Sequence, residues 1–288
     1  MKILLIGSTG LMGTALQSEK SETSHIIPKD HTTLEIKDIN QVRMALDEEK
    51  PDYVINTSAY LGVEPCAENP GDAFAVNTEA VRNLAKLCNE RDICLVHFST
   101  DSVFDGSKGA LYTEDDLPNP LNLYGMTKHM GDLFVQNLCR KHYIIRIPIL
   151  FGPRRNNGSI FIDKMYQRVL SGANELRIAD DVISCPSFSN DIAQGVYEII
   201  ASDKDYGLYH LKNEGVASLY GFAKIFFEKM DIPVRLSRAK AADFSANETE
   251  AKPLNTAICS LKTDHRRPWQ EAMDDYINIL KAQPQEAL

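Results

Sequence analysis

The chain has 288 residues, of which 43% are hydrophobic and 25% charged, as is ordinary for a soluble globular protein. This length suits one large domain or one and a half. The net charge of −9, with no basic stripe, argues against a nucleic-acid binder. The six cysteines are scattered without a Cys-x-x-Cys pair, so we expect neither a zinc site nor a disulfide framework, and a reducing cytoplasm fits best. No apolar run approaches the length of a membrane span.

A short apolar strand followed by three glycines opens the chain. Residues 2–6 are rich in branched side chains, which is typical of a buried parallel strand. Gly7, Gly10 and Gly13 follow with the spacing G-x-x-G-x-x-G, at the start of a helix. Glycine lets a pyrophosphate approach the main chain, and a helix start offers free N–H groups and a positive dipole end. The strand, glycines and helix together favour dinucleotide binding over a purely structural tight turn.

The end of the second strand bears on the choice of dinucleotide. We expect this strand over residues 25–27, ending near Lys29 and Asp30. An acid at this place commonly binds the ribose hydroxyls of NAD, whereas a nearby cation can favour the 2′-phosphate of NADP. Because Asp30 stands between Lys29 and His31, the sequence leaves both cofactors open, and solvated loop charges are a further alternative.

Strands and helices alternate through the first 100 residues. We expect helices over residues 39–49 and 71–90, and strands over residues 51–56 and 93–98. This alternation predicts an α/β fold with a doubly wound parallel sheet of the Rossmann type. Ligands of such a sheet lie at the carboxyl ends of the strands, which places Thr100 beside the predicted dinucleotide site.

Tyr124 and Lys128 are the candidate catalytic pair. Four residues apart in a predicted helix, their side chains lie on one face, and the ammonium is expected to lower the pKa of the phenol. A hydroxyl from Thr100 could hold a substrate carbonyl while Tyr124 protonates it and Lys128 holds the tyrosine and the nicotinamide ribose. Hydride transfer to a ketone needs these groups from the protein. The alternatives are that the pair lies on a solvated helix face and that the hydroxyl of Thr100 only hydrogen-bonds to the backbone at the end of the strand.

The strict alternation weakens after residue 153. We expect an NAD(P)-binding Rossmann domain over residues 1–150, and over residues 151–288 mostly a smaller α/β substrate-binding lobe, interleaved with the sheet. Helices are predicted over residues 161–170, 218–230 and 269–280, and the aromatic stripe of the second is expected to be core. Arg154 could bind a nucleotide diphosphate, with a solvated polar loop as the alternative.

Motifs through nearly the whole chain carry a resemblance to a known family. They include Gly7 to Gly13, Asn56-Thr57-Ser58-Ala59-Tyr60, Ser99-Thr100-Asp101-Ser102-Val103-Phe104, Tyr124-Gly125-x-Thr127-Lys128 and Pro268-Trp269-x-Glu271-Ala272. With them the chain resembles the extended short-chain dehydrogenase/reductases and, among these, the RmlD-like dTDP-4-dehydrorhamnose reductases. The resemblance implies an oxidoreductase of carbohydrate biosynthesis that uses NADP or NAD, with NADP slightly favoured, to reduce a 4-keto nucleotide-sugar.

The resemblance also implies the roles of individual residues, with Thr100, Tyr124 and Lys128 as the catalytic triad. The expected cofactor-binding residues are Gly7, Thr9, Gly10, Leu11, Met12, Gly13, Asp30, Glu35, Ile36, Ser58, Ala59, Tyr60, Asn77, Ser99, Tyr124 and Lys128. The expected substrate-binding residues are Thr100, Asp101, Ile149 and Arg154. No ligand spacing argues for a metal, no membrane or nucleic-acid partner is expected, and a homodimer stays open.

Three departures from the family pattern fall on the substrate side. Ile149 stands where such reductases usually carry tryptophan, Leu61-Gly62 replaces Thr-Ala, and Lys252-Pro253 replaces Arg-Pro. The segment from Arg146 to Gly152 also resembles the regulatory subunit of methionine adenosyltransferase, an NADP-binding partner protein. A non-catalytic NADP-binding partner subunit and a nucleotide-sugar epimerase are therefore the alternative functions.

Overall fold

Six parallel strands form the central sheet of the protein, in the order β10-β5-β4-β3-β1-β2. The computed structural model describes residues 1–20, 23–155, 160–202, 204–244 and 251–282. The strands of the sheet are β1 (Lys2–Ile6), β2 (His25–Lys29), β3 (Tyr53–Asn56), β4 (Cys94–Thr100), β5 (His142–Ile147) and β10 (Gly207–His210). The predicted doubly wound parallel sheet is confirmed, and its last strand comes from the second half of the chain.

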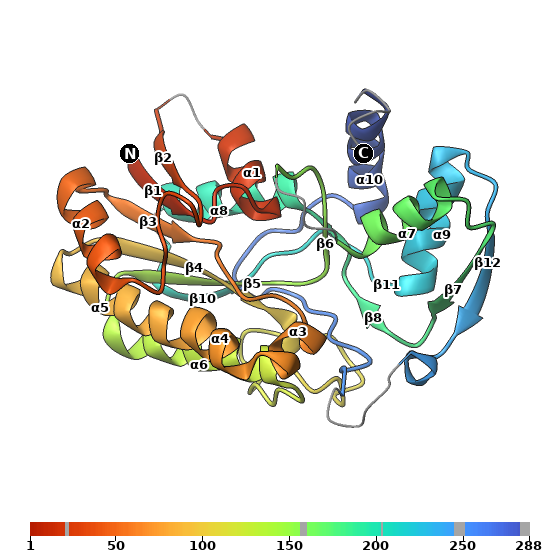
Figure 1. Ribbon diagram of the computed structural model, residues 1–288, viewed down its shortest axis with the longest axis horizontal. Helices are drawn as coiled ribbons and strands as arrows, with labels where there is room; N and C mark the ends of the chain where they lie inside the picture. Colours follow the sequence, from red (N-terminus) through yellow and green to blue (C-terminus); the bar gives the residue numbers. More distant parts are fainter. Residues whose placement is uncertain (21–22, 156–159, 203, 245–250, 283–288) are drawn as a thin grey trace.

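Helices cover both faces of this sheet, because successive side chains of a strand point to opposite faces (Figure 1). Leu4 and Ile6 of β1 belong to one core, shared with α2, α5 and α6. Ile3 and Leu5 belong to the other core, shared with α1 and α8. The bounds of these helices are α1 (Leu11–Ser18), α2 (Ile39–Glu49), α5 (Val81–Glu90), α6 (Leu123–Leu138) and α8 (Ser189–Ala201).

The helix predicted over residues 71–90 is not uniform. It consists of α4 (Pro70–Phe74), a π-helical stretch (Ala75–Ala80) and α5, and a short helix α3 (Val63–Glu68) precedes it. Within the π-helical stretch, Asn77 is buried and bonds to the backbone N–H and C=O of Tyr60, at 2.9 and 3.0 Å. Hydrophobic periodicity does not reveal such an insertion, which is why a single regular helix was expected.

A third core lies in the lobe built after β5, drawn on the right of Figure 1. Phe222 of α9 is 1% exposed there, so the aromatic stripe predicted as core is confirmed. The elements of this part are β6 (Leu150–Phe151), α7 (Phe161–Leu170), β7 (Glu175–Ala179), β8 (Ile183–Ser184), β9 (Ser187–Phe188), β11 (Ala217–Ser218), α9 (Leu219–Met230), β12 (Arg235–Ala239) and α10 (Trp269–Ala282). Two 3-10 turns complete the described elements, at Asp101–Val103 and Ala241–Asp243.

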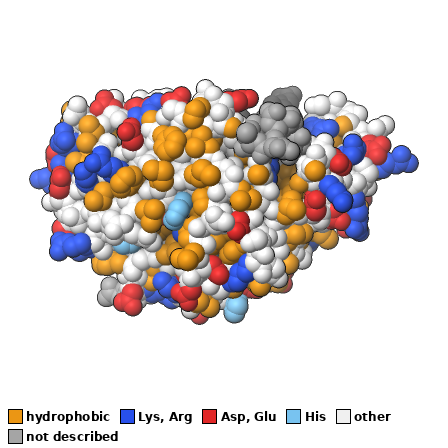
Figure 2. Space-filling model, turned by 90° about the horizontal axis from the view of Figure 1, so that it is seen from below, with side chains coloured by type: hydrophobic (Ala, Val, Ile, Leu, Met, Phe, Trp, Pro, Cys, Tyr) orange, Lys and Arg blue, Asp and Glu red, His pale blue; other side chains and the backbone are white. Residues whose placement is uncertain are grey.

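The outer face of α6 carries an apolar stripe. Met126, Met130 and Leu133 are exposed and lie three or four residues apart, so they share one side of the helix. Phe74 of the neighbouring α4 is exposed as well. Apolar side chains are frequent on this side of the molecule, seen from below in Figure 2. In the described part of the chain, no helix combines the length and apolar character that crossing a membrane requires.

Truncating Phe222 tests the lobe core. Its ring packs against those of Phe151, Phe161 and Trp269. We expect Phe222→Ala to lower the free energy of unfolding in urea by about 3–5 kcal/mol, because it leaves a cavity in a packed cluster. The control Phe244→Ala, at a ring that is 52% exposed, should change that free energy by less than about 0.5 kcal/mol. Equal losses in the two variants would contradict this account of the core.

Candidate active site

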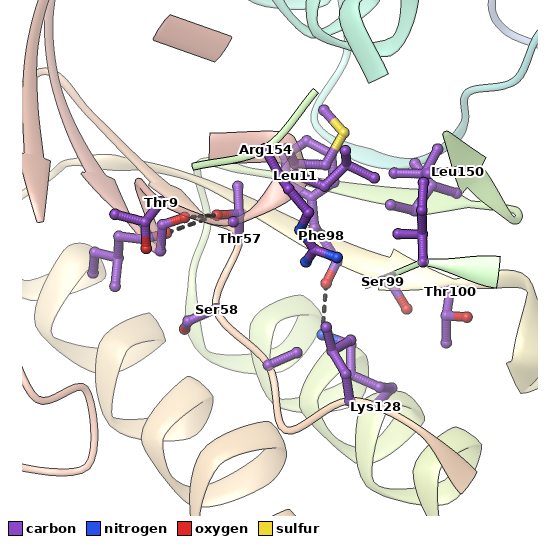
Figure 3. A pocket seen from close by; sticks show the side chains of 18 of the residues that line it. Thr9, Leu11, Thr57, Ser58, Phe98, Ser99, Thr100, Lys128, Leu150 and Arg154 are labelled. Carbon is purple, nitrogen blue, oxygen red and sulfur yellow. Dashed lines mark hydrogen bonds between the residues drawn. The ribbon is translucent and has the colours of Figure 1, made fainter. Parts of the chain in front are cut away.

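A cavity of about 460 Å³ opens at the carboxyl ends of β1, β3 and β4. The chain leaves β1 for β2 on one side and reaches β3 on the other, so the strand order reverses here. Open α/β sheets bind their ligands at such a reversal. Side chains from both halves of the chain line the cavity, among them Thr9, Lys128 and Arg154 (Figure 3).

The glycine turn forms one end of this cavity and permits a close backbone approach. Gly7 has φ +87°, and a Cβ added there would lie 2.6 Å from Thr57 Oγ1. A Cβ on Gly13 would lie 2.2 Å from the carbonyl oxygen of Gly7. Helix α1 begins directly after Gly10, whose position offers no side-chain cap. The free N–H groups of the first turn therefore border the cavity and fit an anionic diphosphate.

Thr57 fixes this turn, although sequence reasoning did not select it. Its hydroxyl donates to the carbonyl oxygens of Ile6 at 2.9 Å and Gly7 at 3.1 Å, and its side chain lines the cavity (Figure 3). The position directly after β3 was a signal that could have revealed it, because ligand contacts follow the carboxyl ends of strands. Ser58 and Ala59, which were predicted, line the cavity beside it.

Asp30 lies at the far end of the cavity, after β2, together with the predicted Glu35 and Ile36. Its Oδ1 accepts hydrogen bonds from the backbone N–H and the hydroxyl of both Thr32 and Thr33. The bonds from these two side chains lower the pKa of Asp30 to about 2. A carboxylate that stays ionised at this place can accept hydrogen bonds from ribose hydroxyls.

Thr100, Tyr124 and Lys128 line the same cavity. Thr100 ends β4, while the other two lie in the first two turns of α6. Asn122 caps this helix by accepting from the N–H of Gly125 at 3.0 Å. A Cβ on Gly125 would lie 2.3 Å from the carbonyl oxygen of Ser102, so glycine lets α6 approach the segment that follows β4.

The electrostatics of this group differ from the prediction. Burial raises the pKa of Tyr124, and its hydrogen bond with Thr100 opposes that rise. The predicted lowering of this pKa is therefore wrong, because desolvation of the phenolate outweighs any nearby positive charge. Lys128 Nζ donates to the carbonyl oxygen of Phe98 at 2.6 Å (Figure 3), and burial lowers the pKa of Lys128 to about 8.

Four predicted site residues do not line the cavity. They are Gly13, Tyr60, Asn77 and Asp101. Gly13 instead allows the contact between α1 and the glycine turn, and Asn77 holds the backbone of Tyr60. Asp101 is buried, and its Oδ2 accepts from the hydroxyls of Ser184 at 3.0 Å and Thr256 at 2.6 Å. The latter two residues belong to the second half of the chain, so Asp101 links both parts of the molecule.

The remaining wall of the cavity is mostly apolar. Ile149 and Leu61, at which the sequence departs from the family pattern, both line it, as does Arg154. Lys252, the third departure, pairs with Glu64 of α3 at 3.4 Å. Further lining residues were not predicted. His31, Leu34, Phe98 and Ile147 belong to the sheet part of the chain, whereas the place of the others depends on how the lobe packs against the sheet; these are Pro148, Leu150, Ile160 and Phe161.

A doubly wound sheet with a glycine turn and a cavity at its strand reversal defines a protein of the Rossmann class. The model of the RmlD substrate binding domain family matches residues 1–282 of this chain. The chain therefore belongs to the RmlD substrate binding domain family. It is similar to a dTDP-4-dehydrorhamnose reductase of Escherichia coli K12, with 30% identity over 270 residues that cover 90% of this chain and 89% of that protein.

Solved structures agree with this assignment. A dTDP-4-dehydrorhamnose reductase of Clostridium acetobutylicum has 31% identity and a TM-score of 0.91, covering 98% of this chain and 100% of its own. A second, from Bacillus anthracis in complex with NADP, has 27% identity and a TM-score of 0.90, covering 96% and 99%. The relatives span the length of the chain, so both the sheet and the lobe are shared.

The buried carboxyl of Asp101 makes stability depend on pH. Burial raises its pKa from the ordinary 3.8 to about 6, so between these values the folded protein retains a proton that the unfolded chain releases. The contribution of this group is present below pH 4 and is lost as the pH rises to about 6, on the order of 3 kcal/mol. We expect Asp101→Asn to reduce this fall in unfolding free energy by about that amount, measured by urea denaturation at stepped pH.

The control for this measurement is Asp105→Asn. Hydrogen bonds, first from the N–H of Ser107, hold the pKa of Asp105 below its usual range. Its removal should leave the fall between pH 4 and 6 in place. An unchanged pH profile in Asp101→Asn would show that this carboxyl is not the source.

Proposed function

We propose that this protein is an NAD(P)H-dependent reductase of a 4-keto nucleotide-sugar, of the dTDP-4-dehydrorhamnose reductase type. One observation carries the proposal. The hydroxyls of Thr100 and Tyr124 and the amine of Lys128 border the same cavity that begins at the glycine turn. The names of the similar proteins support this reaction, since they are reductases of such a sugar.

The cofactor would lie along the carboxyl ends of β1, β2 and β3. The glycine turn and the first turn of α1 would hold its diphosphate, and Asp30 would accept hydrogen bonds from the adenosine ribose. The Bacillus anthracis relative is in complex with NADP, which favours NADP over NAD as the cofactor of this protein. When bound, the reduced nicotinamide supplies the hydride.

The protein's own part in the reaction would be to orient the ketone and deliver a proton. Thr100 would hold the substrate oxygen, and Tyr124, kept as a neutral phenol by its raised pKa, would be the proton donor at neutral pH. Lys128 is an ammonium below about pH 8 and would bind the nicotinamide ribose and offset the charge that develops as Tyr124 loses its proton.

The lobe after residue 150 would bind the sugar nucleotide. Arg154 could meet its diphosphate, and Ile149 and Leu61 would shape the pocket around the sugar. Of the predicted substrate residues, Asp101 would act through Thr100, to whose hydroxyl it is hydrogen-bonded at 3.3 Å.

The six cysteines are free thiols, which supports a cytoplasmic location.

Replacing Tyr124 tests the mechanism. We expect Tyr124→Phe to retain NADPH binding, followed by cofactor fluorescence, and to lose at least ~10²-fold in turnover of dTDP-4-dehydrorhamnose, because the proton donor is gone. The control Tyr220→Phe keeps its ring against Arg238 and should keep its turnover. Undiminished turnover in Tyr124→Phe would reject the mechanism.

The alternative is a non-catalytic partner subunit. It is favoured if the wild-type protein binds NADPH, turns over no nucleotide-sugar and retains a stoichiometric protein from lysate.

The exposed stripe of α6 supports a homodimer. Apolar faces that remain open on a folded chain commonly mark protein contacts, and a second copy would supply a matching stripe. We expect Met130→Glu to halve the molar mass measured by light scattering on a sizing column. Met44→Glu, which places the same charge at another exposed methionine, should leave the mass unchanged. A wild-type monomer would contradict the proposal.

A further inference from the structure

Three successive residues of β4 engage three residues spaced one turn apart on α6. The side chain of Thr100 acts to lower the pKa of Tyr124, and the carbonyl oxygen of Phe98 accepts from Lys128. Between them, the hydroxyl of Ser99 donates to Asp132 Oδ2 at 2.8 Å. Asp132 follows Lys128 by four residues, so the two side chains lie on the same face of the helix. The strand therefore holds Asp132 in line with the two proposed catalytic residues.

Asp132 is part of a cluster of charges with almost no contact with solvent. The exposed fractions are 2% for Lys128, 1% for Asp132 and 2% for Arg146 of β5. Arg146 Nη2 approaches Asp132 Oδ2 at 3.5 Å, and Arg146 also lies over the ring of Phe104. Burying three ionised groups costs free energy of folding unless they neutralise one another. This cluster is therefore better explained by a role in function than by a contribution to stability.

A purely structural ion pair would be built differently. Arginine and carboxylate usually meet through two parallel hydrogen bonds. Here a single long contact joins Arg146 to Asp132, and among the described residues Asp132 Oδ1 and Arg146 Nε and Nη1 have no hydrogen-bond partner. Asp132 Oδ1 lies 3.9 Å from His97 Nε2. The contact with Arg146 thus leaves one oxygen of the carboxylate without a hydrogen-bond partner among the described residues, on the helix face that Asp132 shares with Lys128.

We propose that Asp132 is a positioning residue that keeps Lys128 in its ammonium form, with Arg146 and Ser99 anchoring the carboxylate. Burial lowers the pKa of Lys128, and Asp132 acts against that change. The carboxyl of Asp132 has its own pKa raised by burial, and Arg146, Ser99, Lys128 and His129 all oppose that rise. The role assigned to Asp132 in catalysis rests on the proposed function of Lys128.

The other titratable groups around this cluster do not replace Asp132. Burial lowers the pKa of His97 on β4 and of His129 on α6, so neither adds charge near neutral pH. Burial raises the pKa of the Cys66 thiol on α3, which therefore stays neutral. Asp101 acts on Tyr124, and Arg146 on β5 is a further cation that interacts with Asp132. Among these described groups, Asp132 is the carboxylate that stabilises the ammonium of Lys128.

The test is the ionisation of Lys128 itself, followed by the ¹³Cε chemical shift in protein labelled at lysine and assigned with Lys128→Met. We expect a wild-type midpoint near pH 8. In Asp132→Asn the midpoint should fall by about one pH unit, because the opposing charge is gone while Arg146 remains. Asp132→Glu should restore the wild-type midpoint to within roughly 0.3 unit. The control Asp92→Asn removes a surface carboxylate from Lys141 and the same net charge, and should leave the midpoint unchanged.

Turnover supplies the second readout. The alkaline limb of the kcat/KM profile should move to lower pH in Asp132→Asn in step with the Lys128 midpoint, and return in Asp132→Glu. A purely structural Asp132 would lower activity at every pH without moving that limb. An unchanged Lys128 midpoint in folded Asp132→Asn overturns the inference. A wild-type protein without turnover overturns the proposed function instead, and the chemical-shift titration still decides the inference.

Ser99→Ala covers the case in which Asp132→Asn does not fold. This variant removes the hydrogen bond with which Ser99 is proposed to anchor the carboxylate and favour its ionised form. We expect the Lys128 midpoint to move to lower pH, by less than in the asparagine variant. If Asp132→Asn is unfolded and Ser99→Ala has the wild-type midpoint, the inference is wrong.

Discussion

The contact between the end of β4 and the start of α6 is the constraint on which the candidate site depends. Gly125 permits it, since any side chain there would meet the carbonyl oxygen of Ser102. Asn122 fixes where the helix begins. With those two conditions met, helical spacing alone places Tyr124 and Lys128 against Thr100 and Phe98. A shift of one residue in the start of α6 would turn these side chains away from the strand, so the local sequence determines the geometry of the proposed chemistry.

A second constraint joins the sheet to the lobe. Asp101 follows the last residue of β4 and accepts hydrogen bonds from Ser184 and Thr256, which come from distant parts of the second half of the chain. The position of Asp101, next to Thr100, therefore depends on how the lobe packs against the sheet. Ile149, Arg154 and Phe161 line the cavity from the lobe side, so Asp101 joins the segment that carries Thr100 to the part of the chain that carries these three residues. One buried carboxyl therefore connects the two walls of the cavity.

Much of this could be predicted from sequence because it depends on local patterns. The helices over residues 39–49 and 161–170 have the predicted bounds, and the glycine spacing located the turn after β1. What failed depends on three-dimensional surroundings. Periodicity cannot show that the stretch around Asn77 is π-helical, and spacing cannot show that burial raises the pKa of Tyr124. That Asp101 binds the sugar stays a prediction, and the partners of its carboxyl come from segments that no local pattern connects to it.

The role proposed for Asp132 depends both on a local sequence pattern and on its three-dimensional surroundings. Its spacing from Lys128 was visible in the sequence, yet an acid four residues after a lysine on a helix is usually a weak surface pair worth a few tenths of a kcal/mol. Burial changes its meaning, because in a low-dielectric surrounding one carboxylate decides whether a neighbouring amine keeps its proton. The pKa of Tyr124, the proposed proton donor, is raised by burial, so a stable positive charge nearby would favour the loss of its proton. We propose that this stabilisation of the Lys128 ammonium offsets the free-energy cost of burying the carboxylate of Asp132.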